Sequence, residues 1–303
     1  MRSWLVLVLV GCGGSAAVPS GGGDDDAPVD TTSPEAPPVA CAGKQAQPLD
    51  ATWSVGQRLA RVHVPASYDP SVQTPVVFDV HGRTQNAAGE MALSRSKTKA
   101  DAEGFVVIFP ESATSPTSWN SGSCCDPAST TNLDDTAFMR ALLDLAREQL
   151  CVADDRVFMM GMSNGAYESH RIACELADQF AAIGPVAGLL LFSGCAPSRP
   201  VPVMMVNGTA DQLSQYAFVD AGVDFWVQHN ACTTTETTFT QGDASCVTHG
   251  GCTAGADVVL CTIADGGHQW PGGGTTLPLL GKKSDNLATT DALWDFFKAH
   301  PRP

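Results

Sequence analysis

The sequence predicts an α/β protein, in which a mostly parallel central sheet is flanked by helices on both faces. Short apolar runs recur along the chain, and amphipathic or helix-compatible segments separate them. Strands that alternate with such helices form parallel sheets whose two faces are both covered. The length of 303 residues allows one large domain or two small ones.

Six short segments are predicted to be strands, because they are apolar or β-branched and are bounded by Gly, Pro or polar residues. They cover residues 59–65, 75–80, 105–109, 156–160, 201–206 and 258–263. The first of them alternates only loosely, as an edge strand does. Five methionines in or beside these strands are interpreted as core residues. These are Met159, Met160, Met162, Met204 and Met205.

Four segments are predicted to be helices. They cover residues 90–103, the segment that follows Asp134-Asp135, residues 164–176 and residues 289–299. In the second, Phe138, Ala141, Leu142 and Leu145 follow the i, i+3, i+4, i+7 spacing and form one apolar stripe. The two aspartates before it suit the N-cap and the first turn of a helix.

The composition describes a loop-rich globular protein. The apolar fraction is 44%, the charged fraction is only 16%, and the chain holds 29 Gly and 20 Pro. The formal net charge of −15 argues against nucleic acid as a partner, because phosphates are bound through Lys and Arg. It argues equally against anionic membrane surfaces and is easier to reconcile with a neutral substrate.

The first twelve residues resemble a bacterial lipoprotein signal. Arg2 precedes an apolar run too short to span a bilayer, and that run ends in Leu9-Val10-Gly11-Cys12. In such signals the peptide is cut before the cysteine, which then carries the lipid. We therefore expect residues 1–11 to be a signal peptide and Cys12 to be the lipidation site. The protein would be exported and either lipid-anchored at the bacterial cell envelope or secreted; an ordinary secretory signal is the alternative.

Residues 12–40 are predicted to be a flexible linker. They consist largely of Gly, Ser, Pro, Thr and Asp, and cannot bury enough apolar surface to offset the entropy of ordering. The acidic run within them lacks the alternating ligand spacing of a calcium loop. The globular domain is then expected over residues 41–303.

The eleven cysteines support export. With Cys12 lipidated, ten remain, which is enough for five disulfides. The sequence does not determine their pairing, but adjacent Cys124 and Cys125 are expected to be the ends of two separate disulfides. A zinc site would need paired CxxC spacings, and the chain has none.

Gly161-Met162-Ser163-Asn164-Gly165 matches the pattern GxSxG. The pattern alone is weak, but here it follows a predicted strand and opens a predicted helix, as a nucleophile elbow requires. Glycines are needed on both sides because the turn is sharp and packs tightly. Ser163 is therefore the candidate nucleophile.

A serine hydroxyl needs a base, and that base needs a third group to hold it. His268 lies in a glycine-rich loop between the last predicted strand and the last helix, and Asp211 directly follows the strand that ends at Val206. This chain order of Ser, Asp and His is the one that α/β-hydrolases use. His63 and His170 are interpreted as structural, and Asp220 and Asp224 rank well below Asp211.

Backbone N–H groups are the expected oxyanion donors. One belongs to Asn164, and the other to Arg83 or Thr84 in the loop after His81-Gly82. His81 itself is interpreted as a structural hydrogen-bonding residue. Trp119 and Trp270 are candidates for a substrate-binding wall on exposed loops, with core packing as the equal alternative. This chemistry needs neither a metal nor an organic cofactor.

Together these segments resemble the secreted polyhydroxybutyrate depolymerase and feruloyl or acetylxylan esterase-like family of α/β-hydrolases. The resemblance runs from about residue 55 to residue 297. Six blocks carry it: Val80-His81-Gly82, Trp119-Asn120 with Ser123-Cys124-Cys125, Asp134 to Phe138, Arg156-Val157-Phe158 with Gly161 to Gly165, Val201-Pro202-Val203 with Asn207 to Asp211, and Gly266 to Gly272. It implies the same triad of Ser163, Asp211 and His268. Arg83 and Ala166-Tyr167 stand where similar proteins often carry smaller residues, and we expect them to reshape the site.

The resemblance implies an extracellular serine esterase that acts on a polyester or a plant cell-wall ester through an acyl-enzyme. The sequence does not separate these substrates, and it contains no clear polymer-binding module. A serine peptidase on the same fold and a non-catalytic surface-binding lipoprotein are the rival hypotheses. A monomer is expected, with the membrane contacted only through the N-terminal lipid.

Overall fold

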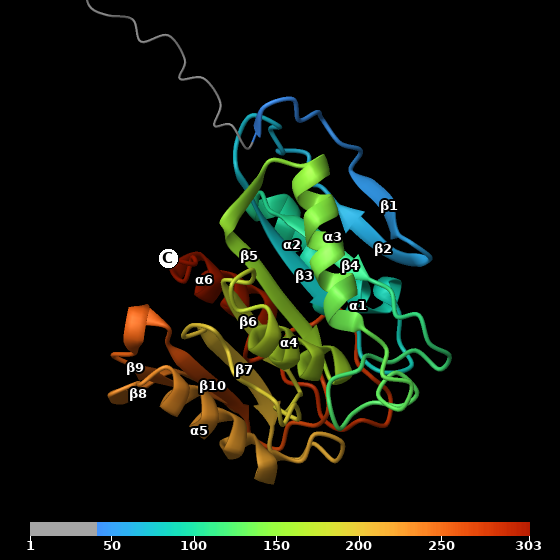
Figure 1. Cartoon of the computed structure of the whole chain (residues 1–303). Coiled ribbons are helices and arrows are strands. Elements are labelled where there is room, and N and C mark those ends of the chain that lie inside the picture. The colour runs from blue at the N-terminus through green and yellow to red at the C-terminus, as the bar shows by residue number, and fades with distance from the viewer. Residues whose placement is uncertain (1–40) are drawn as a thin grey trace, which may run out of the picture. The chain divides into compact units, whose positions relative to one another are not determined.

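A ten-stranded sheet forms the centre of the computed structural model, which describes residues 41–303 (Figure 1). The strand order is β1-β2-β4-β3-β5-β6-β7-β10-β9-β8. The strands are β1 (Asp50–Val55), β2 (Arg58–His63), β3 (Thr74–Val80), β4 (Val106–Pro110), β5 (Val152–Met162), β6 (Ala182–Val186), β7 (Val203–Gly208), β8 (Thr234–Gln241), β9 (Ala244–Gly250) and β10 (Val258–Ile263). The six central strands are parallel, and an antiparallel pair lies at each edge.

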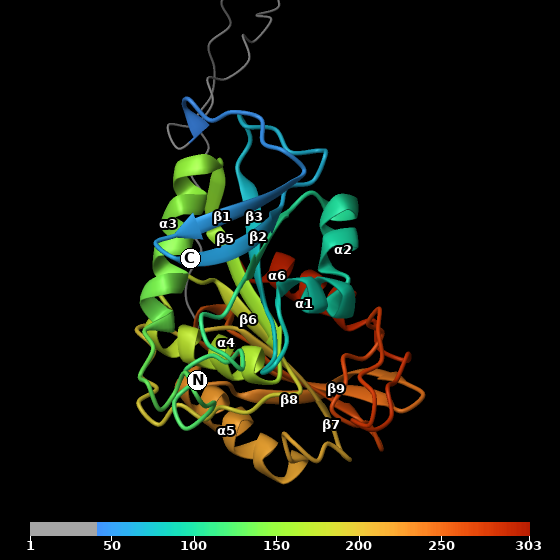
Figure 2. The ribbon, with the colours of Figure 1, turned by 90° about the vertical axis from the view of Figure 1, so that its right-hand side faces the viewer.

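Helices cover both faces of the sheet, as Figures 1 and 2 show. The helices are α1 (Ala87–Ser94), α2 (Ser96–Glu103), α3 (Asp135–Gln149), α4 (Asn164–Glu175), α5 (Val219–His229) and α6 (Thr289–Ala299), with short 3₁₀ turns at Tyr216–Phe218 and Thr253–Gly255. Residues of α3, α4 and α5 belong to one buried cluster, and residues of α1, α2 and α6 belong to the other. The predicted α/β class is therefore confirmed.

The central strands separate these two clusters because their side chains alternate. In β3, Val76, Phe78 and Val80 point into the first cluster, and Val77 points into the second. A strand that is buried on both faces reads as a continuous apolar run rather than an alternating one. That is why the apolar runs of the sequence predict β3, β4, β7 and β10.

The predicted helix over residues 90–103 is wrong in one respect, because the structure divides it into α1 and α2. Arg95, between them, adopts a left-handed conformation with φ of 60°. The break brings the hydroxyls of Ser94 and Ser96 to the buried Asp79, where each donates to Oδ2 at 2.6 Å. The free energy gained by hydrogen-bonding this buried carboxyl exceeds the free energy lost by interrupting the helix, since a buried charged or polar group without partners is costly.

Four strands, β1, β6, β8 and β9, escape prediction from the sequence, and β2 is the second strand of the sheet rather than its edge. β1 and β8 have largely solvated side chains, so no apolar pattern marks them. β6 is buried but carries Gly184 and Pro185, which are unusual in a central strand. Its place is set by its neighbours β5 and β7.

Five disulfides join the ten cysteines of the described residues. They are Cys41–Cys151, Cys124–Cys125, Cys174–Cys195, Cys232–Cys252 and Cys246–Cys261. The expectation that Cys124 and Cys125 end two separate disulfides is wrong, because the two bond to each other. Each of the other eight cysteines has its partner at least 15 positions away in the sequence.

Two kinds of feature are absent from residues 41–303. No helix there has the length and apolar character that crossing a bilayer requires. No group of three or more His, Cys, Asp or Glu side chains there is arranged to hold a metal ion. The predicted signal peptide at residues 1–11, lipidated Cys12 and the linker over residues 12–40 lie outside the described residues.

His81 connects the end of β3 to the loops beyond it. Its ring is buried, with Nδ1 2.8 Å from the Gly82 carbonyl oxygen, and Nε2 accepts from the Ser112 N–H at 3.2 Å. This arrangement holds the neutral ring with its proton on Nδ1. Burial lowers the pKa of His81 to about 4 from its ordinary value of 6.5. The structural role expected for His81 fits this geometry.

The pKa of His81 predicts loss of stability in acid. Between pH 6.5 and about 4 the unfolded chain binds a proton at His81 that the folded protein does not, so stability falls as the pH falls through this window. We expect His81→Asn, which lacks this titration, to lose about 2 kcal/mol less than the unsubstituted protein between pH 7 and pH 4.5. Urea unfolding at both pH values measures this difference, and equal losses would contradict it.

Gly165 packs directly against β3. A Cβ at this position would lie 1.9 Å from the Val80 carbonyl oxygen, whereas a Cβ at Gly89 would meet its nearest neighbour at an ordinary 3.6 Å. We expect Gly165→Ala to lower the free energy of unfolding by about 3 kcal/mol or more. Gly89→Ala, the same change in another helix, should be neutral or slightly stabilising. Urea unfolding of both variants tests this, and a Gly165→Ala protein as stable as Gly89→Ala would refute the close contact.

Candidate active site

Ser163 occupies a sharp turn between β5 and α4. Its φ of 56° and ψ of −119° place a non-glycine residue in a sparsely populated region, which is typical of functional turns. A Cβ on Gly161 would lie 2.5 Å from the Val80 carbonyl oxygen, the atom that Gly165 also approaches. The strand, turn and helix expected of a nucleophile elbow are therefore present, and Ser163 is half-buried at the carboxyl edge of the sheet.

Asp211 and His268 meet behind this turn. Asp211 Oδ2 lies 2.7 Å from His268 Nδ1, and both side chains are almost completely buried. The other oxygen of Asp211 accepts the N–H groups of Leu213 and Ser214, each at 2.8 Å. With both of its oxygens engaged, the carboxylate fixes the ring and keeps the proton on Nδ1, which leaves Nε2 as an acceptor.

Backbone contacts hold the loops of this pair together. The Ala210 N–H donates to the Gly266 carbonyl oxygen at 2.8 Å, and the His268 N–H donates to the Leu280 carbonyl oxygen at 2.7 Å. A Cβ on Gly267 would lie 2.2 Å from that same Leu280 oxygen. Glycine is required there because the loop of His268 passes so close to residues 280–281.

Ser163 and His268 line one cavity of about 440 Å³. Its walls come from the loop after β3, the cysteine pair, the elbow and three leucines. The lining residues are Gly82, Arg83, Thr84, Gln85, Cys124, Cys125, Met162, Ser163, Tyr167, Leu213, His268, Leu277 and Leu280. The structure thus brings Ser163 and His268 together and places Asp211 against the far side of the imidazole.

The competing residues lie elsewhere. Asp220 and Asp224 are exposed on α5. His63 bridges Asp50 at 3.0 Å and Asp101 at 2.8 Å. His170 is buried and accepts from the Trp226 indole N–H at 3.1 Å. These contacts agree with the structural interpretation of both histidines.

The candidate oxyanion donors differ in availability. Asn164 is the first residue of α4, so its N–H has no acceptor within the helix. The Thr84 N–H already donates to the Thr117 carbonyl oxygen at 2.8 Å. This engagement favours Arg83 over Thr84 as the second donor. Gly82, beside them, approaches Ser163 so closely that a Cβ would lie 3.4 Å from the serine Cβ.

The two tryptophans expected to form a substrate wall do not lie on exposed loops. Both indoles are fully buried. Trp119 donates through Nε1 to the His81 carbonyl oxygen at 2.8 Å, and Trp270 donates to Thr290 Oγ1 at 3.1 Å. The alternative of core packing is correct for both, because each indole N–H finds an internal partner.

The structure also adds pocket residues that sequence patterns did not single out. Leu213, Leu277 and Leu280 come from irregular loops without periodicity. Tyr167, noted only as a departure from similar proteins, lines the pocket and pairs its hydroxyl with Ser214 Oγ at 2.7 Å. Arg83 lines the pocket as expected, but its Nε donates to the Asp126 carbonyl oxygen at 3.0 Å.

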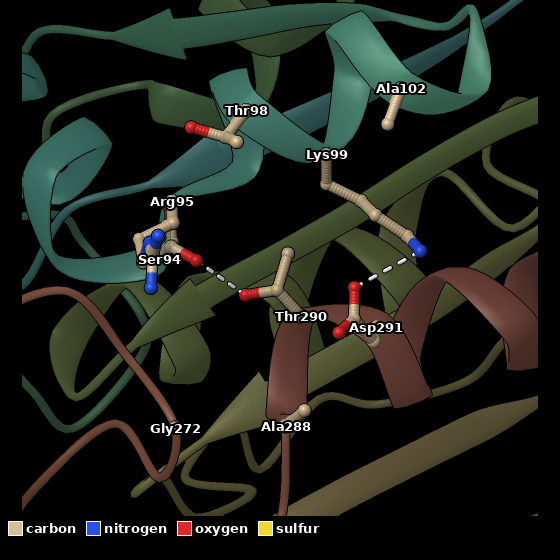
Figure 3. Close-up of a pocket in the computed structure, with 9 residues that line it drawn as sticks. All are labelled: Ser94, Arg95, Thr98, Lys99, Ala102, Gly272, Ala288, Thr290 and Asp291. Carbon is tan, nitrogen blue, oxygen red and sulfur yellow. Dashed lines mark hydrogen bonds and ion pairs between the residues drawn. The ribbon is translucent and has the colours of Figure 1, made fainter.

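A second pocket, of about 290 Å³, lies between α2 and the start of α6 (Figure 3). Two of its charged side chains pair with each other, since Lys99 lies 3.0 Å from Asp291, and Lys99 also lies 2.9 Å from Glu103. Thr290 Oγ1 donates to the Ser94 carbonyl oxygen across the gap. These contacts join α2 to α6, so we interpret this pocket as structural.

Comparisons with known proteins agree with this geometry. Residues 65–247 match the family described as esterase PHB depolymerase. Feruloyl esterase B of Piromyces equi is 29% identical over 68% of this chain and 42% of that protein. Feruloyl esterase C of Emericella nidulans is 27% identical over 85% of this chain and 90% of that protein.

Two further similarities concern length and fold. A bifunctional acetylxylan esterase/xylanase of Neocallimastix patriciarum is 26% identical over 52% of this chain but only 22% of its own length. The chain thus spans less than half of that protein and of feruloyl esterase B. The solved acetyl xylan esterase of Aspergillus awamori superposes with a TM-score of 0.60 at 15% identity, covering 80% of this chain and 94% of that one. This structural similarity shows that the chain has the α/β-hydrolase fold.

The relatives and the family are carboxylic ester hydrolases, as the resemblance of the sequence motifs implied. The family match includes Ser163 and Asp211 and ends before His268. It covers more than half of the chain, and the chain therefore belongs to the esterase PHB depolymerase family.

Proposed function

We propose that this protein is a serine esterase that hydrolyses carboxylic esters through Ser163, His268 and Asp211. One observation carries the proposal: the imidazole that Asp211 holds lines the same cavity as a serine on a nucleophile elbow. This combination supplies a nucleophile, a base with a fixed tautomer and space for a substrate. The catalytic domain is proposed to span residues 41–303.

The reaction would proceed in two acyl-transfer steps. His268 Nε2 takes the hydroxyl proton as Ser163 Oγ attacks the ester carbonyl carbon, and Asp211 stabilises the imidazolium. The backbone N–H groups of Asn164 and Arg83 would stabilise the oxyanion. His268 then protonates the departing alcohol, and in the second step it activates water to hydrolyse the acyl-enzyme.

A polyester of the polyhydroxybutyrate type is the first candidate substrate. The family supports it, and so do the leucines of the pocket, which suit a neutral aliphatic chain. Feruloyl and acetylxylan esters are the second candidate, supported by the relatives of those names. Hydrolysis of polyhydroxybutyrate particles, methyl ferulate and acetylated xylan under one set of conditions would rank them.

The triad predicts the effect of two substitutions on p-nitrophenyl acetate hydrolysis by the full chain. Ser163→Ala should lower kcat by about 10⁶-fold, because the nucleophile is lost. Asp211→Asn should lower it by about 10⁴-fold, because the amide favours the wrong imidazole tautomer. Asp224→Asn, the same change at an exposed helix position, should leave kcat unchanged.

Circular dichroism and the unfolding midpoint would establish that these variants fold. A folded Ser163→Ala protein with normal activity would refute the proposed nucleophile. If all of the folded proteins, including the unsubstituted one, were inert on esters, amide hydrolysis would support the peptidase alternative. Inertness on both classes would support a binding lipoprotein.

Export and lipid anchoring complete the proposal. Five disulfides in the described residues suit an oxidising compartment outside the cytoplasm. The sequence around Cys12 supports a lipid as the membrane anchor. We propose a monomer that contacts the membrane only through this lipid.

The anchor predicts how the protein fractionates in an expressing bacterium. The unsubstituted chain should sediment with membranes, and Cys12→Ala should move to the soluble or secreted fraction because the acyl chains are lost. Immunoblotting of the fractions measures this, with intact mass of the purified N-terminus as the chemical check. A soluble unsubstituted protein without lipid mass would contradict anchoring.

A further inference from the structure

The Cys124–Cys125 disulfide lies in the wall of the cavity that contains Ser163 and His268. Cys125 is 9% exposed, and Cys124 is half-buried. The other four disulfides contribute no residue to this lining. Among the five disulfides of the described residues, this one therefore forms part of the wall of the proposed catalytic pocket.

Hydrogen bonds tie the cysteine pair to the nucleophile elbow. The Cys125 N–H donates to the Trp119 carbonyl oxygen at 3.0 Å. The side-chain amide of Asn164 holds the same Trp119 backbone from both sides, accepting from its N–H at 2.7 Å and donating to its carbonyl oxygen at 3.0 Å. Because Asn164 follows Ser163 in the chain, the disulfide is held in a fixed position relative to the nucleophile.

The same segment also holds the loop after β3. Arg83 Nε donates to the carbonyl oxygen of Asp126, the residue after the cysteine pair, at 3.0 Å. The Thr84 N–H donates to Thr117 at the other end of this segment. Residues 117–126 thus connect the two places that carry the candidate oxyanion donors, and the disulfide lies between these attachments.

The chemistry of a disulfide suits contact with an apolar group. Its sulfurs are polarisable and have no proton to donate, whereas two thiols would add weak donors and reactive nucleophiles. In the proposed reaction His268 must reach the leaving alcohol oxygen, so the alcohol occupies the side of the imidazole. The remaining walls of the cavity, among them Arg83 and the two cysteines, are then available to the acyl substituent.

We propose that the Cys124–Cys125 disulfide is the specificity-determining wall for the acyl group of the ester. This inference rests on the proposed esterase function. It assigns the disulfide to substrate selection: an aliphatic or aromatic acyl chain lies against the two sulfurs. Cys124 and Cys125 are binding residues here and take no part in the bond-making steps.

Kinetics with two substrate series test the assignment. One series varies the acyl chain from acetate to hexanoate with p-nitrophenol as the constant leaving group, and the other varies the alcohol with a constant acetyl group. In the full-length Cys124→Ser/Cys125→Ser variant, the ratio of kcat/KM for hexanoate over acetate should fall by about tenfold, because hydroxyls replace an apolar surface. The alcohol series should be unchanged.

A matched double variant controls for the loss of a disulfide. Cys232→Ser/Cys252→Ser removes a disulfide that lines no part of this pocket, and it should keep the ratio of the unsubstituted protein. Equal ratios in all three proteins would overturn the inference, and so would a change confined to the alcohol series. Failure of the esterase proposal differs from both outcomes, since the unsubstituted protein would then hydrolyse no ester.

A crystal structure of the unsubstituted protein tests the same point even if the pocket variant does not fold. A p-nitrophenyl hexylphosphonate would leave a hexyl chain on Ser163 in the place of the acyl group. Carbon atoms of this chain within about 4 Å of the sulfurs of Cys124 and Cys125 would support the assignment. A chain directed toward Leu277 and Leu280 instead would overturn it.

Discussion

The site depends on the close approach of β3 to the turn after β5. The Val80 carbonyl oxygen lies where a side chain on Gly161 or Gly165 would otherwise be, so only glycines allow the turn to close. This contact holds Ser163 at its positive φ of 56° at the carboxyl edge of the sheet. Because β3 and β5 are neighbours, the loop after β3 then reaches the same edge, and Gly82 packs against the serine. One steric constraint thus brings Ser163 and the loop after β3 together.

Satisfaction of buried polar groups explains much of the remaining architecture. Asp79 is buried near the end of β3, where desolvation raises its pKa to about 7. The hydroxyls of Ser94 and Ser96, which donate to it, lie on either side of the break between α1 and α2. Asp211 is buried as well, but its two oxygens take the imidazole and two backbone N–H groups. The first carboxyl shapes the scaffold beneath the loop after β3. The second orients the imidazole of His268, so two buried carboxyls have different structural roles because their hydrogen-bond partners differ.

Sequence reasoning succeeded where a local pattern and its physical cause coincide. The strand and helix around Ser163, the N-cap of α3 at Asp134 and the apolar strands β3, β7 and β10 follow from periodicity and glycine placement. It failed where no local signal exists. β8 is solvated, β6 contains Pro185, and the backbone of Trp119 is held by the side-chain amide of Asn164, 45 positions later. The pairing of Cys124 with Cys125 was likewise beyond it, because an even cysteine count permits any partners.

The sequence by itself determined the fold class, the esterase family and the candidate residues Ser163, Asp211 and His268. These predictions were possible because the glycines of the elbow form a local pattern and because the order of the three residues along the chain can be read without coordinates. Only the tertiary structure decided which side chains line the same cavity. It also showed that the Thr84 N–H donates to the Thr117 carbonyl oxygen and that a disulfide forms part of the cavity wall. Those properties arise from contacts between segments far apart in the chain, and no pattern along the sequence encodes a distance in space.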